Sequence, residues 1–156
     1  MKTVLIALDY DPTAEKVAEA GAALAKALDA KIILLHVIAE PAYYSSTAYA
    51  PVMGFGGYVD LNFMEPDIID NLKKASEDFL NRSKEHLDDS AIETLVKEGD
   101  IPDCIIAAAK EQSADVIVIG SHSRKWLESI VMGSVTEKVL HHTTTPLFII
   151  PTKKEA

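Results

Sequence analysis

Two short apolar runs stand near the start of the chain, Thr3-Val-Leu-Ile-Ala-Leu8 and Lys31-Ile-Ile-Leu-Leu-His-Val37. Short runs that are apolar at nearly every position are typical of strands buried on both faces, as in a parallel sheet. Between them, apolar residues recur at helical spacing from Val17 to Leu28, after Asp11-Pro12, which offers an N-cap and a proline for the first turn. The segment therefore predicts one strand–helix–strand unit.

The same alternation continues along the chain. The sequence predicts a helix from Ile68 to Leu80, a strand at Ala91–Val96 nearer a sheet edge, a helix opened by Gly99-Asp100, a strand at Asp115–Gly120, a helix from Gly133-Ser134 to Leu140 and a strand at Pro146–Pro151. Alternating strands and helices call for right-handed crossovers and a parallel sheet. We expect an α/β fold, a three-layer α/β/α sandwich around a five-stranded parallel sheet.

The segment from Ala39 to Met64 breaks this alternation, because it is rich in proline, glycine and aromatic residues such as Tyr43 and Phe55. So long an irregular connection is uncommon in a compact domain and is often a lid or a binding loop. The equal alternative is a loop whose aromatic side chains pack on the neighbouring sheet. We predict a single domain over residues 1–156 that carries this loop at about 39–64.

The composition limits the classes of protein. Fifteen Lys and Arg against 24 Asp and Glu give a formal net charge of −9, which argues against the basic surface of a nucleic-acid binder. The apolar stretches fall far short of the ~20 residues that a membrane helix needs. Met1-Lys2 leads into a short apolar run without a secretion cleavage site, and the single Cys104 excludes an internal disulfide. We expect a cytoplasmic protein that binds neither nucleic acid nor membrane.

Candidate binding residues follow the strands. In open sheets of this class, ligands bind outside the carboxyl ends of strands where the strand order reverses, which directs attention to Asp9, Val37 and Gly120. A small residue at a strand end lets a phosphate approach the backbone, and the free N–H groups at the helix that starts with Gly133-Ser134 favour an anion. Arg124 adds local positive charge, which a protein of net charge −9 needs to attract a polyphosphate.

The stretch from Gly120 to Leu140 resembles the nucleotide-binding signature of universal stress proteins, Gly-x2-Gly-x9-Gly-Ser/Thr. Gly120 matches the first glycine, Gly133-Ser134 match the last two positions, and Ser123 stands where the second glycine is usual. Serine adds a Cβ and a hydroxyl, which would either narrow the phosphate pocket or donate a hydrogen bond to an oxygen. We expect nucleotide binding that is weakened rather than abolished.

The resemblance covers nearly the whole chain except 39–64, because the first strand ending on Asp9, the strand Leu34-Leu35-His36-Val37 and the closing helix and strand are also similar. It implies the adenine nucleotide alpha hydrolase-like fold with strand order 3-2-1-4-5 and ATP or AMP as the ligand. The implied binding set is Asp9, Val37, Gly120, Ser123, Arg124, Gly133, Ser134 and Val135. Asp9 would lie beside the ribose and phosphates, in indirect contact with Mg²⁺, and Val37 would present backbone groups to the adenine.

Each of these residues also has a purely structural interpretation. Ser134-x-x-Glu137 is a capping box, which alone explains both residues. Asp9 would otherwise help to cap the first helix, and Gly120 would be only the exit turn of a strand. The binding interpretation is favoured because the residues converge at one end of one sheet.

Three functions compete. The first is a regulatory protein that binds an adenine nucleotide and is at most a slow ATPase, because no positioned base, Walker-type lysine loop or arginine finger is present. The second is an interaction module that dimerises without nucleotide, its crevice filled. The third is an enzyme of related architecture such as a dehydrogenase, but Leu8-Asp-Tyr-Asp-Pro12 stands where such an enzyme carries Gly-x-Gly-x-x-Gly.

The last strand, Pro146–Pro151, is apolar between its two prolines, and an uncovered apolar edge is a template for strand pairing. In the resembled family this strand pairs with its copy across a two-fold axis. We therefore predict a homodimer through residues 146–151, beside a protein partner that the sequence does not identify.

Overall fold

The computed structural model describes residues 1–9, 13–39, 68–121 and 134–152. In chain order the elements are β1 (Lys2–Ala7), α1 (Ala14–Ala27), β2 (Ala30–Ile38), α3 (Ile68–His86), β3 (Glu93–Glu98), α4 (Ile101–Glu111), β4 (Val116–Gly120), α5 (Ser134–His142) and β5 (Leu147–Ile150). Apart from Ala39, the irregular loop predicted at 39–64 lies outside these residues, so neither interpretation of that loop is tested.

The five strands form one parallel sheet in the order β3-β2-β1-β4-β5. This confirms the parallel sheet and the order 3-2-1-4-5, and it places β3 at an edge, as the sequence predicts. β1 pairs with β2 from Lys2 to Ala7. With β4 it pairs only from Val4 to Ile6. The registered pairing of β1 is therefore shorter on its β4 side.

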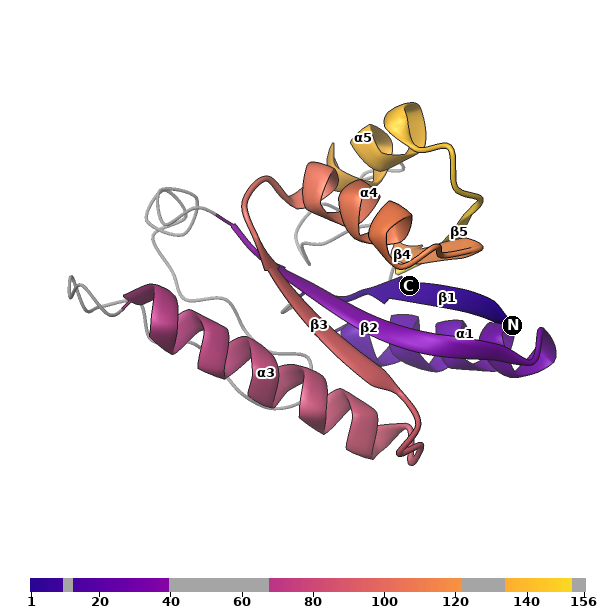
Figure 1. Cartoon of the computed structure of the whole chain (residues 1–156), viewed down its shortest axis with the longest axis horizontal. Helices are drawn as coiled ribbons and strands as arrows, with labels where there is room; N and C mark the ends of the chain where they lie inside the picture. The colour runs from indigo at the N-terminus through magenta and orange to yellow at the C-terminus, as the bar shows by residue number, and fades with distance from the viewer. Residues whose placement is uncertain (10–12, 40–67, 122–133, 153–156) are drawn as a thin grey trace.

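Helices cover both faces of the sheet, α1 and α3 on one and α4 and α5 on the other (Figure 1). Successive side chains of a strand point to opposite faces, so Val4 and Ile6 pack in the core under α1 and α3 while Leu5 packs under α4 and α5. Burial on both faces explains why the strands are continuously apolar. The three-layer sandwich is confirmed.

Close packing of α1 on the sheet depends on Gly21. A Cβ built at this position would lie 2.7 Å from the Ile6 Cδ1 atom and 3.2 Å from the Val118 Cγ1 atom. A side chain at this position would therefore force Ile6 to shift or move the helix away from β1 and β4, the two strands whose ends concern the candidate site.

The starts of three helices can be compared with the sequence prediction. α1 begins at Ala14, with Thr13 at the N-cap position, whereas Asp11-Pro12, the expected start, lies outside the described residues. α5 begins at Ser134, as the sequence predicts, and because Gly133 lies outside the described residues the capping box at Ser134 stays a prediction. In contrast, Asp100 caps α4 as expected, because its Oδ2 accepts a hydrogen bond from the Asp103 N–H at 3.1 Å.

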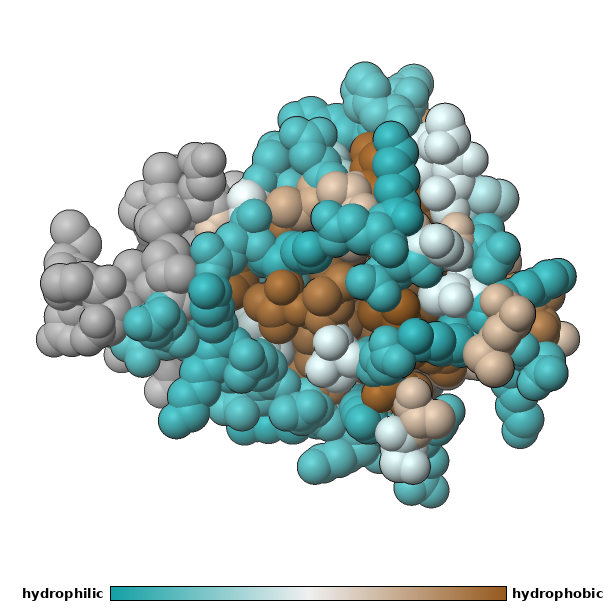
Figure 2. Space-filling view, viewed as in Figure 1, coloured by the Kyte–Doolittle hydropathy of each residue, from teal (hydrophilic) through white to brown (hydrophobic). Residues whose placement is uncertain are grey.

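The surface in Figure 2 is polar over α3 and α4, and apolar residues of the sheet show between these helices. Over the described ranges, the helices are too short or too polar to span a bilayer. The edge strand β3 itself carries charged residues, and two of its ion pairs join it to neighbouring elements: Lys31 to Glu93 at 2.8 Å and Lys97 to Glu111 at 2.7 Å.

Candidate functional site

The strand order reverses between β1 and β4, because the chain builds β2 and β3 on one side of β1 and then returns to place β4 and β5 on the other. The carboxyl ends of these two strands flank the position where doubly wound sheets bind ligands. Registered pairing between them stops at Ile6 and Val118, although β4 continues to Gly120. Beyond this point, the backbone of β1 is bonded to β2 and the backbone of β4 is bonded to α5 and to the end of β5.

At the end of β1, both polar groups of Leu8 are bonded to β2. The Leu8 N–H donates to the Leu35 carbonyl oxygen at 2.8 Å, and the Leu8 carbonyl oxygen lies 2.8 Å from Nδ1 of His36. A carbonyl oxygen only accepts, so Nδ1 carries the proton in this bond. Asp9 is the next residue and is half-buried. The chain that leads into Asp9 is therefore fixed from β2.

His36 is a buried neutral ring. It is 3% exposed and lies edge-to-face against Phe79 of α3, with ring centroids 5.6 Å apart and an interplanar angle of 74°. Burial lowers the pKa of His36 from 6.5 to about 4, against the smaller opposing effect of the hydrogen bond to Leu8. At neutral pH the ring is therefore uncharged and serves as a hydrogen-bond donor inside the core.

At the end of β4, side-chain hydroxyls hold the backbone. Thr136 Oγ1, in the first turn of α5, donates to the Gly120 carbonyl oxygen at 2.7 Å. The Ser121 N–H donates to the Ile150 carbonyl oxygen at 2.9 Å, and the Thr152 N–H donates to Ser121 Oγ at 3.0 Å. The Thr136 bond brings the N-terminal turn of α5 against the carboxyl end of β4.

The residues proposed from the sequence are placed in two groups. Asp9 and Val37 lie at the ends of the neighbouring strands β1 and β2, each two residues beyond the last registered pair, Ala7 with Leu35. Gly120, Ser134 and Val135 belong to the junction of β4 and α5. Carboxyl ends of parallel strands share one edge of the sheet, so both groups lie at that edge.

Three further residues of the expected set, Ser123, Arg124 and Gly133, lie outside the described residues. Where the structure describes side chains, no group of three or more His, Cys, Asp or Glu residues is arranged to hold a metal ion. The expected contact between Asp9 and Mg²⁺ therefore stays a prediction.

Sequence reasoning missed His36 and Thr136 as parts of this region. A histidine inside the otherwise apolar strand Lys31–Ile38 is a visible signal, because a buried imidazole needs a hydrogen-bond partner. Thr136 gives no such signal, since a threonine in the first turn of a helix is ordinary. Its role depends on Gly120, which is 16 residues earlier in the chain.

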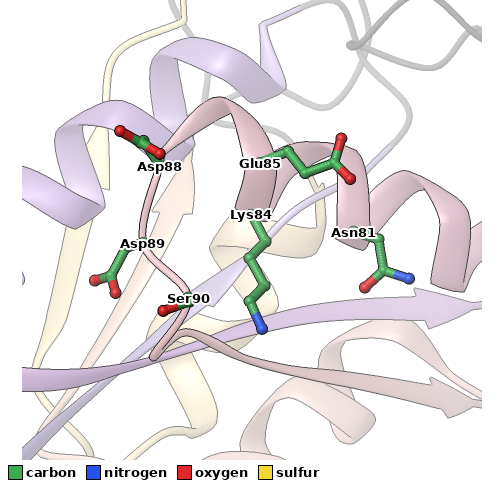
Figure 3. Close-up of a pocket in the computed structure, with 6 residues that line it drawn as sticks. All are labelled: Asn81, Lys84, Glu85, Asp88, Asp89 and Ser90. Carbon is green, nitrogen blue, oxygen red and sulfur yellow. The ribbon is translucent and has the colours of Figure 1, made fainter.

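A hollow of about 430 Å³ lies elsewhere, at the C-terminal end of α3 (Figure 3). It is lined by Asn81, Lys84, Glu85, Asp88, Asp89 and Ser90. These side chains spread in different directions rather than meeting at one point. Because α3 runs antiparallel to the strands, this hollow is at the opposite end of the sheet from Asp9, and we do not assign the site to it.

The fold defines a doubly wound α/β protein, a class in which ligands bind where the strand order reverses, which in this sheet is between β1 and β4. The model of the universal stress protein family matches residues 1–151. The universal stress protein YxiE of Bacillus subtilis is 30% identical over 149 residues, which cover 94% of this chain and 97% of that protein. The chain belongs to the universal stress protein family.

Solved structures agree on the fold. The structure of MJ0577, a universal stress protein of Methanocaldococcus jannaschii, is similar with a TM-score of 0.75 at 24% identity, covering 99% of this chain and 98% of that one. A universal stress protein in complex with cAMP has a TM-score of 0.62 at 19% identity, over 97% and 98%. One from Archaeoglobus fulgidus in complex with dAMP has 0.61 at 20%, over 96% and 98%.

Proposed function

We propose that this protein is a regulatory protein that binds an adenine nucleotide, ATP or AMP, at the carboxyl ends of β1 and β4. The observation that carries the proposal is the Thr136–Gly120 hydrogen bond of 2.7 Å. It holds the first turn of a helix, whose N–H groups have no partners within the helix, beside the point where the strand order reverses, which is a position suited to a phosphate. The cAMP and dAMP complexes of proteins with this fold support an adenine nucleotide.

The proposed roles follow from these positions and, for Ser123, Arg124 and Gly133, from the resemblance to the nucleotide-binding signature of the family. The phosphates and ribose would contact Gly120, Ser123, Arg124, Gly133, Ser134 and Val135, and the adenine would contact backbone groups of Val37. Asp9 would face the ribose and phosphates and contact Mg²⁺ indirectly. Serine at position 123 would weaken the binding without abolishing it, because its Cβ occupies space that glycine leaves open.

Binding, rather than turnover, is the proposed activity, with hydrolysis of ATP slow or absent. His36, which lies near the end of β1, is 3% exposed and its Nδ1–H is bonded to Leu8, so it is poorly suited to be the general base for an attacking water. Nucleotide binding would instead alter a loop or the assembly state of the protein.

Gentle purification followed by mass spectrometry of released small molecules tests the proposal. We expect AMP or ATP to co-purify, and calorimetry on the stripped protein to show binding. Gly133→Val should abolish binding without loss of fold, because a branched side chain would obstruct the helix N-terminus. Thr143→Val, a branched residue just beyond the other end of α5, is the matched control and should bind normally.

Two results would count against this account, in different ways. Normal binding by the Gly133→Val variant would show that the phosphates lie elsewhere. A ligand-free protein that also ignores added ATP and AMP would reject the nucleotide function and favour the alternative, a homodimeric interaction module that works without nucleotide.

We also propose that two chains pair through β5. This strand is at one end of the sheet order, and its Phe148 side chain is 41% exposed, whereas the other edge strand, β3, carries Glu93, Lys97 and Glu98. Charged residues discourage strand pairing between molecules, and an apolar edge promotes it. The proposed dimer interface is formed by residues 146–151 of each chain.

Light scattering distinguishes the two edges. Phe148→Lys should convert a dimer into a monomer, because it places a charge in the proposed interface. Thr94→Lys, at an exposed position of β3, should leave the dimer unchanged. Ile150 is unsuitable for this test because it is 5% exposed and packs in the core. A dimer that survives Phe148→Lys would contradict this interface.

A further inference from the structure

The peptide unit that joins Leu8 to Asp9 lies just beyond the regular end of β1, which is at Ala7. Its oxygen is the Leu8 carbonyl oxygen, and this atom accepts the hydrogen bond from His36 Nδ1 at 2.8 Å. The preceding peptide unit is held through the Leu8 N–H and the Leu35 carbonyl oxygen. Two consecutive peptide planes before Asp9 are thus fixed by β2, the second of them by a side chain.

The donor itself has little freedom to move. His36 is 3% exposed and its ring is packed edge-to-face on Phe79. Leu8 is 5% exposed, so water has little access to replace the bond. A buried side chain whose rotamer is locked by packing is the kind of support that holds a functional group within a fraction of an ångström.

The stability of the fold alone does not explain why position 36 is a histidine. Leu34 and Ile38, which share the face of β2 that His36 occupies, are buried and apolar, and burying an imidazole among them costs free energy that only its hydrogen bonds offset. An apolar residue would avoid that cost, but it would leave the Leu8 carbonyl without this donor. The role left for the histidine is therefore to fix the end of β1 through its hydrogen bond to the Leu8 carbonyl oxygen.

We propose that His36 is a positioning residue of the nucleotide site, which orients the Leu8–Asp9 peptide and thereby directs the Asp9 carboxylate toward the ribose and phosphates. This inference rests on the proposed function. His36 does not touch the nucleotide in this account, because its donor nitrogen faces the backbone of β1. A misdirected carboxylate would lose most of its contribution to binding, since such contributions depend steeply on geometry.

Calorimetric titration with AMP and ATP tests the role in matched variants. His36→Leu removes the donor and keeps an apolar side chain of similar size, and we expect the dissociation constant to rise about tenfold, the effect of losing roughly 1.4 kcal/mol of binding free energy. His36→Asn keeps an N–H donor close to the Nδ1 position and should restore most of the affinity. Phe79→Leu weakens packing on the ring without removing the bond, so it should lower stability and reduce the affinity much less than His36→Leu does.

A double-mutant comparison identifies the group through which His36 acts. If the effect passes through Asp9, His36→Leu should weaken binding much less when Asp9 is already Asn than when Asp9 is present. Full additivity of the two changes would overturn the inference. If the Leu variant does not fold, His36→Phe replaces it, because it keeps a ring against Phe79 and lacks the donor.

The wild-type protein offers a test without substitution. The resonance of the His36 Nδ1 proton should shift when AMP is added, and a resonance that ignores bound AMP would overturn the inference. Normal affinity in the Leu and Phe variants, or failure of His36→Asn to restore binding, would also overturn it while the proposed function stands. A wild-type protein that binds no adenine nucleotide would instead reject the proposed function, and this role with it.

Discussion

The ends of β1 and β4 are fixed in the same way by chemically different groups. At each end a buried side chain donates to a main-chain carbonyl: His36 to Leu8 at 2.8 Å and Thr136 to Gly120 at 2.7 Å. The β1 end leads to a carboxylate, Asp9, and its donor is a titratable ring. The β4 end leads to hydroxyl groups and a helix N-terminus, and its donor does not titrate. The two ends can thus face different parts of one ligand.

The largest expected effect is a loss of folding stability in acid, which should arise at the β1 end through His36 and not at the β4 end. The pKa of His36 is about 4 in the folded protein against 6.5 ordinarily, so between these values the unfolded chain binds more protons and stability falls as the pH falls. The contribution of His36 is complete above pH 6.5 and is lost progressively toward pH 4, by up to about 3 kcal/mol.

Urea unfolding from pH 7.5 to 4.5 measures this loss. Carboxylates also titrate in this range, so the informative quantity is the difference in unfolding free energy between wild type and His36→Asn. This difference should shrink or change sign as the pH falls, because only the wild type must protonate a buried ring. Parallel pH profiles for the two proteins would show that His36 does not carry the effect.

Thr136→Val should have an intermediate effect that does not depend on pH. Valine keeps the shape of threonine but cannot donate to the Gly120 carbonyl, and the loss of such a partly buried hydrogen bond costs about 1 kcal/mol. The N-terminal turn of α5 would be held less firmly, so AMP affinity should fall severalfold by calorimetry. Affinity equal to that of the Thr143→Val control would show that this bond does not position the site.

Ser121→Ala should have the smallest effect. It removes the acceptor of the Thr152 N–H at 3.0 Å, but Ser121 is half-buried and water can replace the hydroxyl. We expect a loss of about 0.5 kcal/mol in unfolding free energy and little change in AMP affinity. A loss as large as that of Thr136→Val would mean that the segment after β5 also fixes the end of β4.

The sheet was predictable from the sequence because strands buried on both faces are continuously apolar, as in Thr3–Leu8. Phe148 and Ile150 share one face of β5, yet one is exposed and the other is buried; a uniformly apolar run does not show how far along a strand the covering elements reach. The end of α3 at His86 was also missed. The chain leaves this helix through Asp88 at a φ of 51° rather than through a glycine that would mark the end.

The candidate site was only partly predictable, for a related reason. Asp9, Val37 and Gly120 could be proposed because they follow or close recognisable strands. The donors that fix these strand ends could not, because they depend on contacts across the fold: His36 is 28 residues from Leu8, and Thr136 is 16 residues from Gly120. Strand register and helix placement, which the sequence does not display, bring these pairs together.

The most direct test of nucleotide binding at the ends of β1 and β4 is a titration of the isotope-labelled protein with AMP, followed through its backbone amide resonances. The largest shifts should occur at Asp9, Val37, Gly120 and Ser134. Shifts confined to Lys84 and Asp88, beside the hollow at the end of α3, would contradict it, as would a spectrum that AMP leaves unchanged.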